Sequence, residues 1–449
     1  MRKGRGEAGE TVTGGRAATV RHVFGERVLS ICMPKGKDHP RGWRWVALSD
    51  VAQMESGHTP SRNHPEYWGG DIPWISVKDA RLAHGKRLSE TEEYTNSLGI
   101  ANSSARLLPE GTVCLSRGGT VGYVVILDKP MATSQGFANW ICGPQLIPEF
   151  LQYLLLAEAE SLEKFSIGTT IKTIYYPDLK AFHVCLPPLA EQKRIVALLD
   201  QAFAGIDEAM AKAEASFRDA KALFESHLQS VFSTNGTGWS DESVEDLVAD
   251  AILAKPFDGN HGEIHPKQSD YTPEGIPFIM ARDLQNGHVD TTSCIFISEK
   301  LAKSLRVGFA KMGDVLISHK GTIGRSAIVD KVDGEYIMLT PQVTSYRIID
   351  TSRLSNRFLR YYFMSPEFLS EMISGALDGS TRAYIGITKQ LKLRLRFPSL
   401  VEQIRILERM EALELETQKL TSIYERKLPC LDALKKSLLT QAFAGELTA

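Results

Sequence analysis

The sequence predicts an α+β protein in which two mixed helix-and-strand blocks follow one another in tandem, each continued by a long helix. Two observations carry this prediction. Apolar residues recur at steps of three and four through 196–224 and 406–438, and similar phrases occur in the same order before each of these stretches. At 449 residues the chain is also too long for one compact core. We therefore expect a basic segment at 1–41, blocks at 42–187 and 238–398, and helices at 188–237 and 399–449.

Both long helices carry the apolar seam of a coiled coil. In the first, the seam extends over about four heptads, more than an ordinary amphipathic helix requires. Pro429 interrupts the second seam, so we expect a kink or a break near Leu428. The expected seam residues are Val196, Leu199, Phe203, Ile206, Met210, Phe217 and Phe224 in the first helix, and Ile406, Met410, Leu413, Leu420, Tyr424 and Leu431 in the second.

The two blocks read as copies of one unit. Their shared phrases keep the same order while the offset between partners drifts from 196 residues at the start to 211 at the end, as expected when loops diverge after duplication. The paired phrases are 72–75 with 276–279, 111–116 with 313–318, 119–122 with 321–324, 168–170 with 379–381, and 187–192 with 398–403.

Within each block we expect a hairpin around a glycine-rich turn, because glycine permits positive φ and close backbone approach. The hairpin strands are 113–115 with 123–127 in the first block and 315–318 with 326–329 in the second. Amphipathic helices are expected at 148–165 and 354–373, and a last strand at 181–186 and 392–397.

The composition is that of an ordinary globular protein, with 43% hydrophobic and 24% charged residues. No apolar run is long enough for a transmembrane helix, and the first thirty residues lack the apolar core of a signal peptide. The six cysteines include no CxxC pair, which argues against a zinc site or a disulfide framework. A reducing, cytoplasmic location is therefore expected.

The formal net charge of −2 does not indicate a nucleic-acid-binding protein. If the chain binds DNA, its charge is segregated in space or a partner supplies part of the phosphate contact. Gly4, Gly6 and Gly9 match GxGxxG, but no strand precedes them, so a disordered basic tail is the preferred interpretation of 1–41.

Catalytic motifs are weak in this sequence. Asp178, Glu191 and Lys193 satisfy a PD…ExK nuclease pattern, which needs its acids on adjacent strands, whereas Glu191 begins a long helix. His261 and His265 are spaced like zinc ligands but have no evident third partner. We expect no catalytic residue and no metal site in this chain.

The polar loops offer candidates for binding nucleic acid, since Arg, Lys, Thr and Tyr on glycine-rich turns can reach phosphates and base edges. For any one of them, ordinary solvated surface is the alternative. The candidates are Arg62, Lys78, Arg117, Gly119, Thr120, Thr169, Thr170 and Lys172 in the first block, and Arg282, His319, Lys320, Thr322, Thr381, Arg382 and Tyr384 in the second.

The chain resembles the specificity subunit of a type I restriction–modification system. Five motifs carry the resemblance: GHTPSR at 57–62, YWGGDIPW at 67–74, LSRGGTVG at 115–122, LPPLAEQ at 186–192 and QAFAGEL at 441–447. Each is weak alone, but they occur in the expected order and together extend over residues 42–447.

The resemblance implies that each block is a target-recognition domain for one half of a bipartite double-stranded DNA sequence, and that the helices form an antiparallel coiled coil. The helices would set the spacer and dock two modification subunits. S-adenosylmethionine, ATP and Mg²⁺ would belong to the modification and restriction subunits, so this chain would not itself be an enzyme. Two alternatives stay open: a specificity subunit of a type IIB-like system, and a coiled-coil scaffold that binds protein rather than DNA.

Overall fold

The computed structural model describes residues 40–168, 172–233, 238–376 and 384–447. Its contacts divide the chain into two compact units, unit 1 (1–213 with 426–449) and unit 2 (214–425). Each unit therefore contains one of the expected blocks and part of each long helix. Of the expected basic segment 1–41, all but Pro40 and Arg41 lies outside the described residues.

Unit 1 is built on a mixed five-stranded sheet in the order β2-β10-β6-β8-β4, in which only the β4–β8 pair is parallel. The expected hairpin is present as the antiparallel pair β6 and β8. The elements are β1 Arg44–Ala47, α2 Leu48–Val51, β2 Ala52–Ser56, η1 Pro65–Tyr67, β3 Trp68–Ile75, α3 Val77–Leu82, β4 Arg87–Leu88, β5 Glu93–Thr95, α4 Ser97–Ala101, β6 Val113–Ser116, β7 Gly118–Gly119, β8 Val124–Leu127, β9 Ala132–Thr133, β10 Phe137–Cys142, α5 Pro148–Ala157, α6 Ala159–Phe165, β11 Lys172–Thr173, α7 Tyr176–Lys180 and β12 His183–Leu186.

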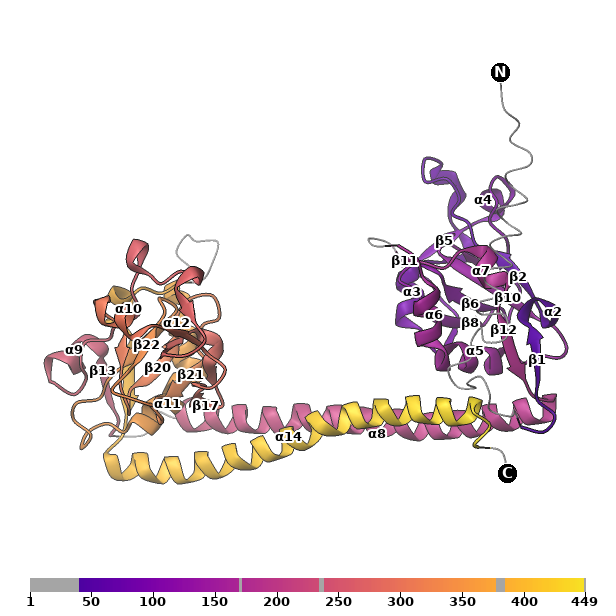
Figure 1. Ribbon diagram of the computed structural model, residues 1–449. Coiled ribbons are helices and arrows are strands. Elements are labelled where there is room, and N and C mark those ends of the chain that lie inside the picture. The colour runs from indigo at the N-terminus through magenta and orange to yellow at the C-terminus, as the bar shows by residue number, and fades with distance from the viewer. Residues whose placement is uncertain (1–39, 169–171, 234–237, 377–383, 448–449) are drawn as a thin grey trace, which may run out of the picture. The chain divides into compact units, whose positions relative to one another are not determined.

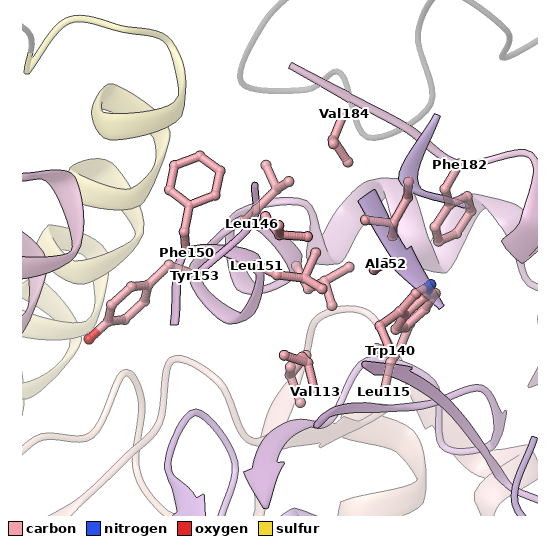
Figure 2. Close-up of a cluster of buried hydrophobic side chains, with 14 of the residues drawn as sticks. Ala52, Val113, Leu115, Trp140, Leu146, Phe150, Leu151, Tyr153, Phe182 and Val184 are labelled. Carbon is pink, nitrogen blue, oxygen red and sulfur yellow. The ribbon is translucent and has the colours of Figure 1, made fainter. Parts of the chain in front are cut away.

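Both faces of the unit 1 sheet are covered, because β6 and β8 are buried at every position. Alternate side chains of a strand point to opposite faces. On one face, Val113 and Leu115 join Trp140, Phe150 and the last strand in a single cluster (Figure 2). Cys114 and Phe137 belong to a second cluster. Two buried faces explain why these strands read as unbroken apolar runs in the sequence.

Unit 2 repeats this plan with two mixed five-stranded sheets, β14-β18-β15-β22-β19 and β16-β17-β21-β20-β23 (Figure 1). Its hairpin β20–β21 is antiparallel, also as expected. The elements are β13 Ser240–Ser243, α9 Val244–Ala249, η2 Gly262–Ile264, η3 Gln268–Asp270, β14 Tyr271–Thr272, β15 Ile276–Ile279, η4 Ala281–Asp283, β16 Leu284–Gln285, β17 Gly287–Val289, β18 Ile295–Ile297, α10 Glu299–Ser304, β19 Phe309–Ala310, β20 Val315–Ser318, β21 Ser326–Ile328, β22 Ile337–Leu339, β23 Val343–Tyr346, α11 Asn356–Phe363, α12 Pro366–Ala376, α13 Ile387–Gln390 and β24 Arg394–Phe397.

The expected helices 148–165 and 354–373 are each divided in two. Glu158 separates α5 from α6 with ψ of 18°, outside the helical range. Pro366 begins α12 after α11 has ended, consistent with the preference of proline for a first helical turn. The expected last strands are present as β12 and β24, which pair antiparallel with β1 and β13 respectively. The beginning and end of each block are thereby joined.

The two long helices are α8 (Leu189–Ser233) and α14 (Leu400–Phe443), and they lie side by side within each unit (Figure 1). In unit 1 the start of α8 shares a core cluster with the end of α14, through Leu199 and Phe443. In unit 2 the end of α8 meets the start of α14, through Phe232 and Leu407. Within each unit, therefore, the helices run antiparallel, as expected.

The seam of α8 follows the expectation: Leu199 and Ile206 are buried, and the other expected residues are half-buried. In α14, Met410, Tyr424 and Leu431 lie in the seam as expected, and the other three expected residues do not. Leu420 is 40% exposed, so its assignment to the seam is wrong, and Ile406 and Leu413 flank the seam. The buried and half-buried residues that fit alternating steps of three and four are Leu407, Met410, Glu414, Thr417, Thr421, Tyr424, Leu428, Leu431, Lys435, Leu438 and Ala442.

Polar side chains in the α14 seam explain two of the errors, because counting apolar residues alone selects Leu413 and Leu420 in place of their polar neighbours Glu414 and Thr421. Glu414 occupies a seam position where it bonds to Arg360 and Tyr361 of unit 2. Lys435 occupies another, where it pairs with Asp207 of α8 in unit 1. α14 is helical on both sides of Pro429, so the helix does not break near Leu428, and the kink expected as the alternative stays a prediction.

Among the described residues, no helix is long and apolar enough to cross a lipid bilayer.

Candidate nucleic-acid interface

The glycine-rich turn of unit 1 connects β6 to β8 and is closed by its own serine. Ser116 accepts hydrogen bonds from the backbone N–H of Tyr123 at its Oγ (2.8 Å) and of Gly122 at its carbonyl (3.0 Å). Gly119 and Gly122 have φ of +83° and +106°, a region that L side chains rarely adopt. Gly119 and Thr120 are exposed, so this turn presents backbone and hydroxyl groups to solvent.

The glycine-rich turn of unit 2 is built in the same way. Ser318 accepts from the N–H of Arg325 at its Oγ and of Gly324 at its carbonyl, both at 2.9 Å. Lys320 and Thr322 are exposed in this turn. The repeat inferred from the sequence therefore extends to individual hydrogen bonds.

A second segment, which we call the return loop (residues 168–174 in unit 1 and 379–385 in unit 2), is bonded to each glycine-rich turn. In unit 1, Lys172 and Thr173 (β11) pair with Gly119 and Gly118 (β7). In unit 2, Tyr384 forms the equivalent bridge to Lys320. The candidates Thr169, Thr170, Thr381 and Arg382 belong to these loops but lie outside the described residues.

Arg117 stabilises the loops of unit 1 from within. Its guanidinium lies 3.9 Å from the ring centre of Tyr176 and donates to the carbonyl of Ile174 at 3.1 Å. The side chain is half-buried, and these two contacts hold the return loop against the glycine-rich turn, while its buried Nε has no hydrogen-bond partner within the described residues.

His319 occupies the corresponding place in unit 2 and is fully buried. Its Nδ1 lies 2.7 Å from the hydroxyl of Thr344, and burial lowers the pKa of its imidazole to about 4, so the ring is neutral at pH 7. Because the His319 side chain is fully buried in this conformation, it cannot contact a ligand. Like Arg117, it supports the turn that carries it.

Arg62 lies against aromatic rings in the loop between β2 and η1, residues 57–64. Its guanidinium is 3.8 Å from the ring centre of Trp68, and its Nη2 donates to Glu93 at 2.7 Å. The side chain is about half exposed and remains accessible at its outer edge.

Lys78 and Arg282 occupy matching positions after β3 and β15. Lys78 is exposed and pairs with Glu92 at 2.6 Å, and Arg282 is also exposed. The acids that follow them in the sequence are buried, because Asp79 and Asp283 accept backbone N–H groups, each at 2.8 Å, and thereby fix the turn. The repeated basic–acidic phrase thus combines an exposed cation with a buried capping carboxylate.

Gly57 in unit 1 and Gly259 in unit 2 each lie directly against the backbone of a neighbouring segment. A Cβ at Gly57 would lie 1.9 Å from the carbonyl oxygen of Ser134, and one at Gly259 would lie 2.0 Å from that of Leu339. No side chain fits at these distances, so the close approach requires glycine at both positions.

We expect Gly57→Ala to lower the stability of unit 1, and Gly259→Ala that of unit 2, by about 2–3 kcal/mol or more, because the backbone must move to admit a methyl group. Urea unfolding of the full chain measures this. Gly205→Ala is the matched control, since nothing lies within 4 Å of its Cβ position on α8. A Gly57→Ala protein as stable as that control would contradict the close approach.

The nuclease pattern does not assemble. Asp178 lies on the short helix α7, while Glu191 lies on the first turn of α8 and bonds to Arg194 at 2.8 Å. His261 pairs with Asp258 at 2.8 Å. Within the described parts of the chain, no three His, Cys, Asp or Glu residues are grouped so that they could hold a metal ion.

Gln192 and Gln403 were not identified from the sequence as functional residues, although both lie in a repeated phrase. Gln192 is fully buried at the start of α8, accepts the N–H of Ile147 at 2.9 Å, and donates to the carbonyls of Gln145 and Pro187. It therefore fastens the first turn of α8 to the block before it. The sequence signal for Gln192 and Gln403 was that the phrase containing them recurs just after the last strand of each block.

Gln403 repeats this arrangement at the start of α14. It accepts the N–H of Ser355 at 2.9 Å and donates to the carbonyls of Arg353 and Pro398, both at 2.9 Å. Its side chain is also fully buried. The same buried amide thus sets where each long helix begins.

Comparison with known proteins identifies the family. A family model described as the type I restriction modification DNA specificity domain matches residues 40–214 and 257–425. The specificity subunit of the type I restriction enzyme MjaIX from Methanocaldococcus jannaschii is 26% identical over 357 residues, which cover 78% of this chain and 81% of that protein. The EcoBI specificity subunit from Escherichia coli is 23% identical over 431 residues, covering 91% and 86% respectively.

Solved structures share the fold. One, described as the structural basis of complex assembly and conformational transition of the type I R-M system, has a TM-score of 0.71 at 21% identity and covers 92% of this chain and 100% of its own. The crystal structure of the HsdS subunit from Thermoanaerobacter tengcongensis has a TM-score of 0.53 at 21% identity, with coverage of 92% and 99%. Since the family model matches well over half of the chain, in two separate segments, the chain belongs to the type I restriction–modification DNA specificity family, whose role is recognition of the DNA target.

Proposed function

We propose that each unit reads one half of a bipartite double-stranded DNA target, and that the two long helices set the spacer between the half-sites. One observation carries this proposal: the same glycine-rich turn, bonded to the same return loop, occurs once in each unit. Two equivalent binding surfaces in one chain suit a target that has two parts.

The proposed contact surface consists of the exposed residues of the turns and return loops. Hydroxyls, ammonium groups and the backbone of glycines at positive φ are suited to phosphate oxygens and base edges. The described members of this surface are Gly119, Thr120 and Lys172 in unit 1, and Lys320, Thr322 and Tyr384 in unit 2. Thr169, Thr170, Thr381 and Arg382 belong to it by sequence.

We further propose that two modification subunits dock on the long helices and carry out methylation with S-adenosylmethionine, while restriction subunits supply the chemistry that uses ATP and Mg²⁺. The chain itself would act in the cytoplasm as a non-catalytic subunit. Exposed apolar residues on the helices support a docking role, among them Leu198, Leu223 and Leu415 at 40%, 57% and 53% exposure.

Exchanging residues 44–186 for the corresponding block of another specificity subunit is expected to change one half of the methylated motif and leave the other half intact. The ends of the exchanged segment lie on β1 and β12, which pair with each other, so the insert closes on itself. The measurement is single-molecule methylome sequencing of cells that carry the system.

The matched control is the reciprocal exchange of residues 240–397, whose ends lie on the paired strands β13 and β24. It should change only the other half of the motif. If either exchange altered both halves, the assignment of one half-site to each unit would be wrong. If the wild-type system gave no sequence-specific methylation, the role in DNA target recognition would fail for this chain.

A further inference from the structure

Unit 2 contains a cavity of about 570 Å³ next to its glycine-rich turn. Gly324 and Arg325, at the end of that turn, form one wall. The β16–β17 turn forms another, and α8 and α14 form the floor, with Lys221 and Glu414 among the lining residues. All of these residues belong to unit 2, and Gly324 and Arg325 belong to the same glycine-rich turn as Lys320 and Thr322 of the proposed contact surface.

Four basic side chains line the cavity: Lys221, Arg282, Arg325 and Arg360. Its single lining carboxylate, Glu414, is already engaged, because it accepts hydrogen bonds from Arg360 at 2.9 Å and from the hydroxyl of Tyr361 at 2.5 Å. Arg360 is thus neutralised, and the other three cations set the charge of the cavity.

Of these three cations, only Arg282 has a carboxylate partner within the described residues. The nearest carboxylate to Arg282 is Asp283, 3.5 Å from its Nε, and that carboxylate is buried and committed to the N–H of Met280. Within the described residues, no carboxylate forms an ion pair with Lys221 or Arg325. The cavity is therefore positively charged although the chain as a whole carries −2.

The fold does not require basic residues at these positions. Tyr123 holds the place of Arg325 in unit 1, since its N–H makes the same bond to the turn serine. Gln152 holds the place of Arg360: it donates to the carbonyl of Lys86, where Arg360 lies beneath Gly287. Two of the four cations of unit 2 are thus neutral in unit 1. Arg360 has a structural partner in Glu414, whereas Arg325 forms no ion pair within the described residues, so it is Arg325 that points to a ligand rather than to a structural need.

The remaining lining groups suit a phosphodiester. Thr417, Gln418, Thr421 and Asn286 add hydroxyl and amide groups around the cations. A phosphate group with its flanking sugars needs a mixture of positive charge and neutral hydrogen-bond donors. Free phosphate shares this chemistry, but a cavity continuous with the glycine-rich turn favours the backbone of DNA already bound there.

We propose that this cavity binds a backbone phosphate of the DNA that flanks the half-site read by unit 2. The contact is independent of sequence, fixes the duplex relative to the helix pair, and rests on the proposed function. Because Tyr123 and Gln152 hold the places of Arg325 and Arg360 in unit 1, the two half-sites are held unequally.

The test compares Lys221→Gln, Arg325→Gln and the double variant with wild type, each co-purified with its modification subunits. The affinity for a target duplex is measured against salt concentration. Each lost phosphate contact lowers the steepness of log affinity against log salt by about one unit, and the cavity holds one phosphate, so the double variant should lose about one unit and each single variant less. The methylated motif should not change, because these residues touch no base.

Lys300→Gln is the matched control, an exposed lysine of α10 that does not line the cavity. Its salt slope should equal that of wild type. If the cavity variants keep the wild-type slope while wild type still methylates its motif, the cavity proposal is overturned and the proposed function stands. A wild-type complex without any methylated motif would instead contradict the proposed function.

Two further outcomes also decide the matter. If inorganic phosphate raises the melting temperature of wild type but not of Arg325→Gln, while the DNA salt slope is unchanged in that variant, the cavity binds free phosphate and the DNA proposal is overturned. If the variants lose the modification subunits while the DNA salt slope is unchanged, the cavity is a protein interface, and the proposal that it binds a DNA phosphate is overturned.

Discussion

The Gln192→Leu variant is expected to unfold unit 1 at a clearly lower urea concentration than wild type, with a loss of about 3 kcal/mol in the free energy of unfolding. Leucine nearly matches the volume of glutamine, so the core stays filled. The loss comes from three backbone groups that lose their partner: the buried carbonyl of Pro187, and the part-buried N–H of Ile147 and carbonyl of Gln145. Each such group costs about 1–3 kcal/mol when it is left unpaired.

Urea unfolding of the full chain, followed by far-UV circular dichroism, measures this loss. Gln201→Leu is the matched control, because Gln201 is an exposed glutamine on the same helix, and its substitution should change stability by less than about 0.5 kcal/mol. Gln403→Leu should weaken unit 2 by a similar amount. Equal stability of Gln192→Leu and Gln201→Leu would show that the buried amide does not fasten α8.

The effect should extend to function, because the amide sets the direction in which each long helix leaves its block. Gln192 and Gln403 each join the first turn of a helix to two carbonyls and one N–H of the preceding block. A flexible joint at this point would let the block tilt on its helix. We therefore expect the Gln192→Leu complex to methylate its motif less completely even where the protein remains folded.

Local patterns in the sequence were sufficient to predict the hairpins and last strands. The strands β6 and β20 are short apolar runs followed by glycine, and a run buried on both faces leaves few alternatives. Duplication strengthened each assignment, since an element inferred in one block could be checked in the other. The glycine-rich turns were therefore located before any contact was known.

The functions of individual polar residues could not be predicted in this way. Arg117 and His319 were grouped with the exposed candidates because they lie in the glycine-rich turns, yet both point inward. Burial of one polar side chain depends on partners distant in sequence, such as Tyr176 and Thr344. No local pattern contains that information.

The prediction of the α14 seam was wrong in part for a related reason. Glu414 lies in the seam because unit 2 supplies Arg360 and Tyr361 to bond it, and a count of apolar residues excludes it. The charge of the chain illustrates the same limit. A net charge of −2 conceals a cavity lined by four basic side chains and one carboxylate.

Inserting one heptad into each long helix is expected to lengthen the spacer of the methylated motif by about three base pairs without altering either half-site. The insertion points are between Ala213 and Phe217 in α8 and between Tyr424 and Leu428 in α14, and seven residues preserve the three- and four-residue steps of both seams. Seven helical residues add about 10 Å at 1.5 Å per residue, and one base pair of duplex occupies about 3.4 Å.

Methylome sequencing measures the spacer directly. The length-neutral control replaces the exposed residues Glu214 and Glu425, near the same two points, with alanine, and should leave the motif unchanged. An insertion into α8 alone should abolish methylation, because it moves the remainder of that seam past an unextended α14. An unchanged spacer in the paired insertion would show that the helices do not set it. Altered half-sites would show that the reading surfaces depend on more than their own unit.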